Sequence, residues 1–399
     1  MESSVSANVQ VVGVGMIPFG KPGRTDSYDV MGEQAARAAL QDAGIAYELV
    51  QQAYVSYVYG DSTCGQAAIY GLGQTGIPVI NVNNNCASGS TALWLARQAV
   101  AGGAAECVIA LGFEQMQAGA LKGNWDDRPR AMARGIETMK GIQGLQDSAP
   151  MAAQLFGGGG QAYMDKYGIT NEAFAKIAVK SRRHAANNPY AVFRDPISEE
   201  QVLASPHQYG PLTRLMCCPP TCGAAAVIIA SEDFARRHGL RTDVRIKAQA
   251  MTTDFSSTFD TGDMMRVIGY DMTKDAARQV FEAAGVGPED IPVVELHDCF
   301  TSNEFITYEA LRLTPEGTAE KFVMDGDNTY GGRVVVNPSG GLMSKGHPLG
   351  ATGLAQCTEL VWQLRGEAEA RQVDGARLAL QHNLGLGGAA VVTLYEKVK

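Results

Sequence analysis

MGEQAARAALQDAGI (residues 31–45) and MTKDAARQVFEAAGV (residues 272–286) align without a gap. Both have the apolar spacing of an amphipathic helix, and both close with an Ala-Gly pair that is typical of a helix end. Each follows an apolar, strand-like run and precedes another, so each predicts the helix of a β–α–β unit. Because the pattern occurs only twice, it excludes a solenoid and predicts a duplicated α/β fold with two largely parallel sheets.

A second pair of segments extends the duplication. CASGSTAL (residues 86–93) aligns with HPLGATGL (residues 347–354), and both have the glycine-rich character of a helix start. In this register, Cys86 and His347 stand at equivalent helix N-termini. Helix starts and strand ends at one edge of an α/β sheet are where sites gather, so the pairing points to a shared site.

A stretch of the first half has no counterpart in the second. We therefore expect an inserted loop domain at residues 119–208, an N-terminal half made of 1–118 and 209–242, and a C-terminal half at 243–399. Within the insertion, the run Gly157–Gly160 predicts a flexible joint. Such an insertion is able to cover a site, and a plain surface excursion fits the sequence equally well.

Composition and charge narrow the class of protein. The 399 residues are 45% hydrophobic and carry a net charge of −9 with dispersed basic residues, which favours a small-molecule partner over nucleic acid or an anionic membrane. No apolar stretch reaches the roughly 18 to 20 residues that span a bilayer, and the first residues lack the layout of a signal peptide. The chain closes with EKVK rather than a peroxisomal Ser-Lys-Leu signal, so we expect a cytoplasmic protein.

The eight cysteines have no regular spacing, which favours free thiols over a disulfide framework. Three of them form the cluster CCPPTC, at Cys217, Cys218 and Cys222. This cluster lacks a nearby fourth ligand at the spacing of a zinc finger. We therefore expect no metal site.

Cys86 is a candidate nucleophile because of the segment in which it lies. It follows three asparagines and precedes small residues at an expected helix start. The main-chain N–H groups there favour a thiolate and stabilise an oxyanion formed beside it. A small buried residue that packs a strand-to-helix turn explains the same pattern, so the motif alone leaves both interpretations open.

Histidines in the second half favour the catalytic interpretation. His297 and Cys299 close an apolar strand in HDCF, where we expect both side chains to share one face. His347 is able to pair with the Cys86 thiolate or to relay its proton, and His382 lies in the closing QHNLGLGG. For each histidine, a hydrogen-bonded place in the core is the alternative.

These motifs resemble those of a known enzyme family. NNNCASGSTAL, ELHDCFTSNE, NPSGGLMSKGHPLGATGLAQC and LQHNLGLGGAAVVTLY are similar to the thiolase domain of sterol carrier protein x, the sterol carrier protein two type of thiolase, and the similarity covers nearly the whole chain. The resemblance implies a thiolase fold, with two βαβαβαββ halves in a five-layer αβαβα core and an inserted loop domain. It also implies a homodimer or a dimer of dimers, with Asp61–Gln66 near the partner subunit.

The resemblance further implies roles for individual residues. Cys86 is the acylated nucleophile, His347 its activator and His297 an oxyanion donor. Cys299 is the second acid/base, because HNLGLGG stands where commoner thiolases carry a Cys-x-Gly loop. Further candidates are Gly385, Gly387 and His382 for the second oxyanion site and the substrate, and, as a weaker assignment, Arg182, Arg183 and Arg214 for the CoA phosphates.

The expected activity is that of a 3-oxoacyl-CoA thiolase, an acetyl-CoA or propionyl-CoA C-acyltransferase of fatty-acid or sterol side-chain degradation. Acyl-CoA and CoA are its substrates, and the resemblance implies no metal or redox cofactor. Since EKVK follows the last strand closely, we expect no appended sterol-carrier domain. The alternatives are a β-ketoacyl synthase-like condensing enzyme, which HDCF disfavours; a thiolase-like aldolase, which Cys86 disfavours; and a non-catalytic acyl-CoA or lipid-binding protein, which the intact Cys86, His347 and Cys299 disfavour.

Overall fold

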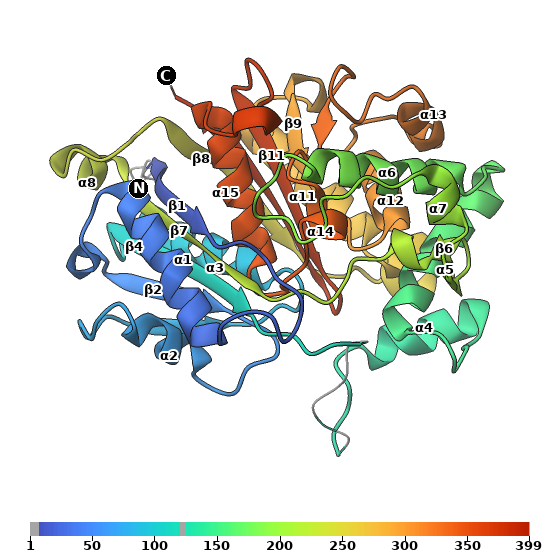
Figure 1. Cartoon of the computed structure of the whole chain (residues 1–399), viewed down its shortest axis with the longest axis horizontal. Coiled ribbons are helices and arrows are strands. Elements are labelled where there is room, and N and C mark those ends of the chain that lie inside the picture. The colour runs from blue at the N-terminus through green and yellow to red at the C-terminus, as the bar shows by residue number, and fades with distance from the viewer. Residues whose placement is uncertain (1–7, 120–124, 126, 399) are drawn as a thin grey trace.

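A ten-stranded ladder runs through the part of the chain that the computed structural model describes, residues 8–119, 125 and 127–398 (Figure 1). Five of its strands come from the N-terminal half, in the spatial order β3-β2-β4-β7-β1, and only β7 runs antiparallel to its neighbours. These strands are β1 (Val9–Met16), β2 (Gln52–Ser56), β3 (Val79–Val82), β4 (Cys107–Glu114) and β7 (Gly223–Ser231).

The C-terminal half repeats this arrangement in the order β10-β9-β11-β12-β8, with β12 antiparallel. Its strands are β8 (Val244–Thr252), β9 (Val293–Glu295), β10 (Val335–Val336), β11 (Leu378–Gly385) and β12 (Ala389–Lys397). The two half-sheets join through a single residue pair, Gln10 opposite Arg245. The same strand order in both halves confirms the predicted duplication.

Helices lie on both sides of each half-sheet and between the two. The central pair is α3 (Ser88–Ala101) and α15 (Thr352–Arg365), which pack on each other within one core cluster that both half-sheets share. Outside the N-terminal half lie α1 (Tyr28–Ala43) and α2 (Cys64–Tyr70), and outside the C-terminal half lie α11 (Tyr270–Ala284) and α12 (Thr301–Ala310). This α–β–α–β–α stacking confirms the predicted fold class.

The repeated Ala-Ala-Arg motif explains why α1 and α11 form and face inward. Ala35 and Ala36 are fully buried, whereas Arg37 is exposed and pairs with a glutamate one turn away. Ala276 and Ala277 are likewise buried beneath an exposed arginine. Small side chains on the inner stripe therefore allow close contact with the sheet, and the charged residue stays in water.

The two central helices correspond in a different register from the one that the sequence predicted. Both have 14 residues, and they begin at Ser88 and Thr352. Cys86 thus lies two residues before its helix and His347 five residues before its own, so they are not equivalent helix starts. The alignment was misled because both segments are rich in glycine and small residues, which fit more than one register; in the structure Gly89 faces Gly350, and a Cβ on Gly89 would lie 2.9 Å from the Gly350 oxygen.

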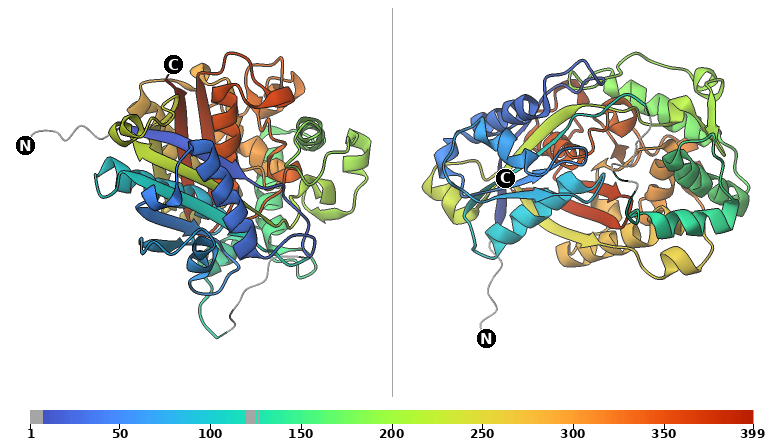
Figure 2. Two further views of the ribbon diagram at one scale, coloured as in Figure 1. Left: turned by 60° about the vertical axis from the view of Figure 1, so that its left-hand side comes forward. Right: turned by 90° about the horizontal axis from the view of Figure 1, so that it is seen from below.

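Four helices and a small hairpin lie between β4 and β7, beside the C-terminal half (Figure 2). They are α4 (Ala133–Gln143), α5 (Met151–Tyr167), α6 (Glu172–Ala185), α7 (Glu199–Leu203), β5 (His207–Tyr209) and β6 (Leu212–Thr213). The predicted joint at Gly157–Gly160 is wrong, because all four glycines are buried inside α5. They serve close packing: a Cβ on Gly157 would lie 2.7 Å from the main-chain oxygen of Tyr209.

Short elements complete the described chain. They are α8 (Glu232–Arg237), α9 (Ser257–Asp260), α10 (Met264–Val267), α13 (Ala319–Met324), α14 (Gly341–Ser344), and the 3-10 turns η1 (Tyr47–Leu49), η2 (Arg214–Met216), η3 (Pro288–Asp290) and η4 (Glu369–Arg371). Among the described residues, no helix combines the length and the apolar character that crossing a membrane requires.

Candidate active site

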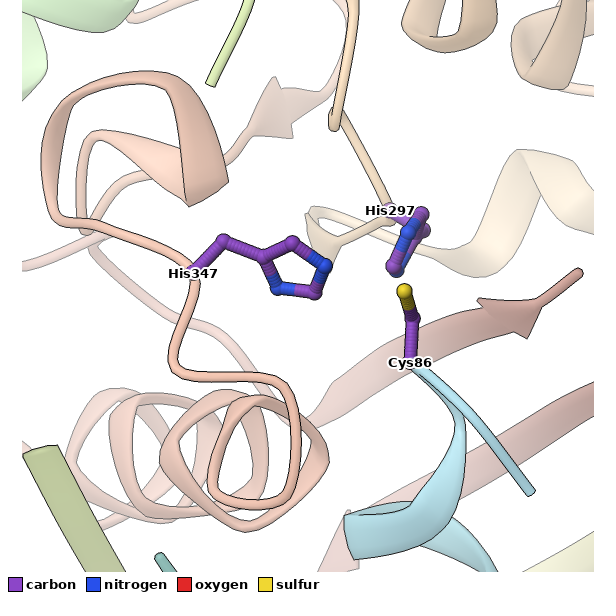
Figure 3. A group of neighbouring side chains, drawn as sticks. All are labelled: Cys86, His297 and His347. Carbon is purple, nitrogen blue, oxygen red and sulfur yellow. The ribbon is translucent and has the colours of Figure 1, made fainter. Parts of the chain in front are cut away.

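Three predicted site residues from distant parts of the chain converge on one point. Cys86 precedes α3, His297 follows β9, and His347 precedes α15. One thiol sulfur and one ring nitrogen from each histidine all lie within 4.8 Å of one another. Figure 3 shows the Cys86 sulfur and the His347 ring both directed toward His297, whose ring stands edge-on to that of His347 at 5.0 Å.

The three asparagines before Cys86 build the turn that presents it. Asn83 Oδ1 accepts the Asn85 N–H at 3.0 Å, and Asn85 adopts a left-handed φ of 52°, which asparagine tolerates. Asn85 Nδ2 then donates to the Leu386 carbonyl at 3.1 Å, and Asn84 N donates to the Ser88 hydroxyl at 2.8 Å. These bonds fix the sharp change of direction, so that Cys86 projects from the junction between β3 and α3.

The glycines after β11 differ in how close they come to this turn. A Cβ on Gly385 would overlap the Asn84 carbonyl and lie 3.0 Å from the Ala87 nitrogen, so only glycine fits there. Gly387 has a left-handed φ of 93° in the turn between β11 and β12, and a Cβ there would make only an ordinary contact, 3.9 Å from Met132. The structure therefore brings Gly385 beside the Cys86 turn.

The hydrogen bonds of His347 decide which of its nitrogens carries the proton. Nδ1 lies 2.7 Å from the Thr352 hydroxyl, and that hydroxyl lies 3.0 Å from the Pro348 carbonyl. A carbonyl only accepts, so both contacts are hydrogen bonds only if the hydroxyl donates to Pro348 and Nδ1–H donates to the hydroxyl. His347 Nε2 then bears a lone pair, and this buried atom has no hydrogen-bond partner among the described residues.

His297 has the opposite tautomer, and Asn383 imposes it. Asn383 Nδ2 donates to the Cys86 carbonyl at 3.1 Å, which fixes the orientation of the amide because a carbonyl is only an acceptor. The same NH₂ group lies 3.0 Å from His297 Nδ1, which must therefore accept. The proton of the neutral His297 ring consequently sits on Nε2.

Cys86 Sγ lies within 4.8 Å of one ring nitrogen of each histidine, and of these rings His347 offers Nε2 as a base and His297 offers Nε2–H as a donor. Cysteine and histidine at this spacing are also metal ligands, yet a protonated nitrogen offers no lone pair to an ion. With only Cys86 and His347 left to coordinate, the donor set fits proton transfer better than metal binding.

The electrostatics of the pair differ from what a helix start predicts. Burial and, to a smaller extent, the nearby Glu114 carboxylate together raise the pKa of Cys86 to about 12. Burial also lowers the pKa of His347 to about 3. The resting pair is therefore a neutral thiol beside a neutral imidazole, because desolvation outweighs the N–H groups of α3. The expectation of a thiolate stabilised at rest is wrong, and proton relay is the interpretation that fits.

His382 contacts the main chain of His297. It is fully buried; its Nδ1 faces the His297 main-chain N–H at 3.5 Å, and its Nε2 lies 3.0 Å from the Thr273 hydroxyl. Burial lowers the pKa of both His382, to about 3, and His297. Because both nitrogens of His382 have partners, the structure leaves it no free group for a substrate.

Cys299 reaches the site by a different route from the one predicted. Strand β9 ends at Glu295, so His297 and Cys299 lie in a loop and do not share a strand face. The Cys299 carbonyl accepts the Cys218 N–H at 2.9 Å across a short bridge. Burial raises the pKa of the Cys299 thiol, and the charges that Cys218 and Cys86 would carry raise it further.

The three arginines predicted for CoA phosphates have different surroundings. Arg182 stacks on the Phe193 ring at 4.5 Å, and Arg183 donates to the Thr329 hydroxyl at 3.0 Å. Arg214 is exposed in the 3-10 turn before Cys217. Their assignment to CoA remains a prediction.

Sequence reasoning missed Asn383, Cys218 and Glu114. Asn383 directly follows a histidine that drew attention instead, and Cys218 was considered only as a metal ligand. Glu114 had a signal of its own, because it is the sole charged residue of the otherwise apolar strand CVIALGFE and is 1% exposed. A carboxylate buried at the end of a strand that leads toward a site is a recognisable candidate.

Similar proteins agree with this architecture. The family model of the thiolase N-terminal domain matches residues 9–233, and that of the thiolase C-terminal domain-like family matches residues 255–396. Sterol carrier protein 2 of Gallus gallus is 58% identical over 97% of this chain and 71% of its own length, and that of Homo sapiens is 55% identical over 99% and 73%. The benzoylsuccinyl-CoA thiolase subunit BbsB of Thauera aromatica is 37% identical over 95% of both chains.

Solved structures share the fold at lower identity. Human mitochondrial 3-ketoacyl-CoA thiolase in complex with CoA superposes with a TM-score of 0.73 at 20% identity, over 99% of both chains. The Ltp2-ChsH2(DUF35) aldolase superposes with a TM-score of 0.82 at 23% identity, over 98% of both chains. The two matching domain models and the high identity to whole-chain relatives establish that this chain belongs to the thiolase family of acyltransferases.

Proposed function

We propose that the chain is a 3-oxoacyl-CoA thiolase, which cleaves a 3-oxoacyl-CoA with CoA through an acyl group carried on Cys86. The observation that carries the proposal is the pair of opposite tautomers around that thiol. A nucleophile that is protonated at rest needs a base on one side, and the carbonyl that it attacks needs a donor on the other.

In the first half-reaction, Cys86 Sγ attacks the 3-keto carbon while its proton passes to His347 Nε2. The carbonyl oxygen becomes negative and accepts a hydrogen bond from His297 Nε2–H. As the oxyanion collapses, the carbon–carbon bond breaks and the shortened acyl group stays on Cys86. The departing enolate of acetyl-CoA or propionyl-CoA takes the proton of Cys299.

In the second half-reaction, the thiol of CoA gives its proton to the Cys299 thiolate and attacks the acyl group. The new tetrahedral intermediate expels Cys86, which regains its proton from His347. Each group thus returns to its starting state, and CoA is consumed as a cosubstrate. The raised pKa values of Cys86 and Cys299 support this order, because each thiol gives up its proton only when a substrate group or a base is there to take it.

The proposal extends to substrate and assembly. The relatives named sterol carrier protein 2 support thioesters of fatty acids or sterol side chains as substrates, and Arg182, Arg183 and Arg214 are candidates for the CoA phosphates. Strand β3 lies at the edge of the ten-stranded ladder, and a free strand edge supports pairing with a second copy in a homodimer or a dimer of dimers. We also propose that the protein is cytoplasmic and that residues 119–208 form an inserted loop domain.

Mass spectrometry of the protein mixed with 3-oxoacyl-CoA, without free CoA, tests the central step. We expect an acyl adduct on Cys86 of the wild type and none on Cys86→Ala. Cys107→Ala is the matched control, since Cys107 is a fully buried thiol on β4, and it should still acylate. An adduct on Cys86→Ala, or on another cysteine of the wild type, would contradict the assignment.

A panel of straight, methyl-branched and sterol side-chain 3-oxoacyl-CoAs then separates the rival activities. A thiolase releases at most one equivalent of acetyl-CoA or propionyl-CoA per Cys86 without CoA, and it turns over repeatedly only when CoA is added. A condensing enzyme would instead decarboxylate a malonyl donor, an aldolase would release a ketone or aldehyde without CoA, and a binding protein would release nothing.

A further inference from the structure

Gly350, three residues after His347, is buried in the opposite half of the molecule. A Cβ at this position would lie 2.6 Å from the main-chain oxygen of Ser56 on β2 and would overlap that of Phe113 on β4. A Cβ on Gly112 would in turn overlap the Gly350 carbonyl. The loop that carries His347 therefore packs directly against the ends of the paired strands β2 and β4, and the close approach of Gly350 to Gly112 leaves no room for a Cβ on either residue.

Two side chains of the N-terminal half hold the Gly350 residue from both sides. Glu114 Oε2 accepts the Gly350 N–H at 2.9 Å, and the Ser56 hydroxyl donates to the Gly350 carbonyl at 2.8 Å. Ser56 is fully buried and Glu114 is 1% exposed, so water does not compete for either bond. We call Ser56 and Glu114 the Gly350 clamp.

Glu114 also binds the N-terminal half itself. Its carboxylate accepts the main-chain N–H groups of Val58 at 3.1 Å and Tyr59 at 2.9 Å. Three peptide groups, two from one half and one from the other, thus share a single carboxylate. Because a carboxylate is an acceptor with several lone pairs, it is well suited to join donors from different segments, which an apolar side chain could not do.

We propose that the Gly350 clamp positions His347, so that Ser56 and Glu114 set the separation between His347 Nε2 and Cys86. The proposal rests on the proposed function, in which His347 is the base. Cys86 belongs to the N-terminal half and His347 to the C-terminal half, so their approach depends on how closely the His347 loop docks. The Gly350 hydrogen bonds fix that docking within three residues of the base.

The expected effect is steep because proton transfer depends strongly on distance. A displacement of about 1 Å in a catalytic group costs up to about 100-fold in rate. We expect Glu114→Gln and Ser56→Ala to slow single-turnover acylation of Cys86 by about 10- to 100-fold. Ser56→Ala removes one hydroxyl only, so it tests the clamp with little risk to folding.

A double-mutant cycle separates positioning from general damage. Each clamp variant is made in the wild type and in His347→Ala, and acylation of Cys86 is timed by mass spectrometry. If the clamp acts through His347, it should slow acylation by less than about twofold further once His347 is absent. An equal slowing in both backgrounds, or no slowing in the wild type, would overturn the proposal.

Glu309→Gln is the matched control. Glu309 is also a buried carboxylate that accepts three main-chain N–H groups, those of Gly317, Thr318 and Ala319, but it lies on α12 away from Cys86. We expect this variant to lose stability without slowing acylation. If it slowed acylation as much as Glu114→Gln, loss of a buried carboxylate in general, rather than positioning, would be the cause.

The same cycle with iodoacetamide keeps the two proposals apart. Alkylation of Cys86 needs only the thiol and its base, so it reports on the clamp whether or not the chain cleaves 3-oxoacyl-CoA. If the wild type fails to form an acyl-enzyme, the proposed function is rejected. If the clamp variants nevertheless slow alkylation only when His347 is present, the clamp proposal still holds.

Discussion

Cys86 and Cys299 are both thiols that do not ionise readily. Burial raises the pKa of both, and nearby acidic groups raise it further. A thiol with a raised pKa keeps its proton and is a poor nucleophile at rest. The site therefore does not react until a substrate arrives. Cys86 has His347 beside it as a base, whereas Cys299 has other thiols as neighbours, which suits the two residues to different steps.

Replacing Cys299 tests its role as the second acid/base. We expect Cys299→Ala still to accept an acyl group on Cys86 from a simple acyl-CoA, because that step uses only Cys86 and the two histidines. It should lose carbon–carbon cleavage by about 100-fold or more, the scale of a lost general acid/base. It should also lose exchange of the α-protons of acetyl-CoA with deuterated water, measured by NMR.

Cys218→Ala is the control for that experiment, since Cys218 is a half-buried cysteine whose main-chain N–H donates to the Cys299 carbonyl. We expect it to keep both cleavage and exchange. If Cys218→Ala lost exchange and Cys299→Ala kept it, Cys218 rather than Cys299 would be the second acid/base.

Asn383 tests the tautomer of His297. We expect Asn383→Asp to move the His297 proton from Nε2 to Nδ1, because a carboxylate accepts where the amide donated. Acylation of Cys86 should then fall by about 100-fold or more, the usual cost of a lost oxyanion donor. Nitrogen-15 NMR of histidine-labelled protein measures the proton position directly.

Asn328→Asp is the matched control, because it makes the same substitution at another buried asparagine. The Asn328 amide donates to the Tyr308 hydroxyl, away from Cys86. It should leave the His297 signals and the acylation rate unaltered. A wild-type spectrum with the His297 proton already on Nδ1 would refute the assignment.

Among the elements, α5 shows how packing overrides local preference. Glycine is a poor helix former, yet α5 carries four in a row and all are buried. The run lets α5 approach β5, α12 and the segment before α11 closely, and these neighbours replace the flexibility that a glycine run has in isolation. The helix therefore exists because of its contacts, and its glycines set how near the neighbours come.

Two glycine substitutions separate these effects. We expect Gly157→Ala to lower the free energy of unfolding by about 1–3 kcal/mol, because a Cβ would lie 2.7 Å from the Tyr209 carbonyl. Gly141→Ala, in α4 with open space around it, should instead raise stability by up to about 1 kcal/mol. Urea unfolding curves measure both. Equal stabilisation by the two changes would show that α5 is loosely packed.

Across the whole molecule, the two halves are joined by the core cluster around α3 and α15 and by buried polar contacts, rather than by main-chain pairing of the sheets. The sheets share one residue pair. The Arg365 guanidinium of α15 reaches Asp42 of α1 at 2.7 Å, and Glu114 joins Gly350 to the N-terminal half. The active site lies between the halves, so these contacts bear on both stability and chemistry.

The Glu114 contact predicts a dependence of stability on pH. Burial raises the pKa of Glu114 from 4.5 to about 7, so the folded state holds this proton more tightly than the unfolded chain. Its contribution to stability is complete below pH 4.5 and is lost as the pH rises through 7, a change of about 3 kcal/mol at about 1.4 kcal/mol per pH unit.

Glu114→Gln cannot ionise and lacks this change. We therefore expect the unfolding free energy of Glu114→Gln, relative to that of the wild type, to rise by up to about 3 kcal/mol between pH 5 and pH 8, measured by urea unfolding at each pH. Comparing the two proteins cancels the other titrating groups. A difference that stayed constant with pH would mean that Glu114 titrates near its ordinary value.

Local pattern was sufficient for the fold and for the residue types of the site. The Ala-Ala-Arg stripes identified α1 and α11, because burial of one helix face follows from the spacing of small residues along the chain. Cys86, His297, Cys299 and His347 stood out because each lies in a short motif at the end of a strand or the start of a helix. Register was harder, since glycine-rich helix starts look alike, and the alignment of His347 with Cys86 was wrong by three residues.

Tertiary structure alone decided the chemistry of those residues. The tautomer of His297 follows from Asn383, 86 residues away, and the His347 loop is held by Glu114, 236 residues before Gly350. Burial, rather than the helix start, sets the pKa of Cys86. Motifs record which groups are present, but proton positions and pKa values depend on distances and desolvation in space, and these arise only when distant segments pack together.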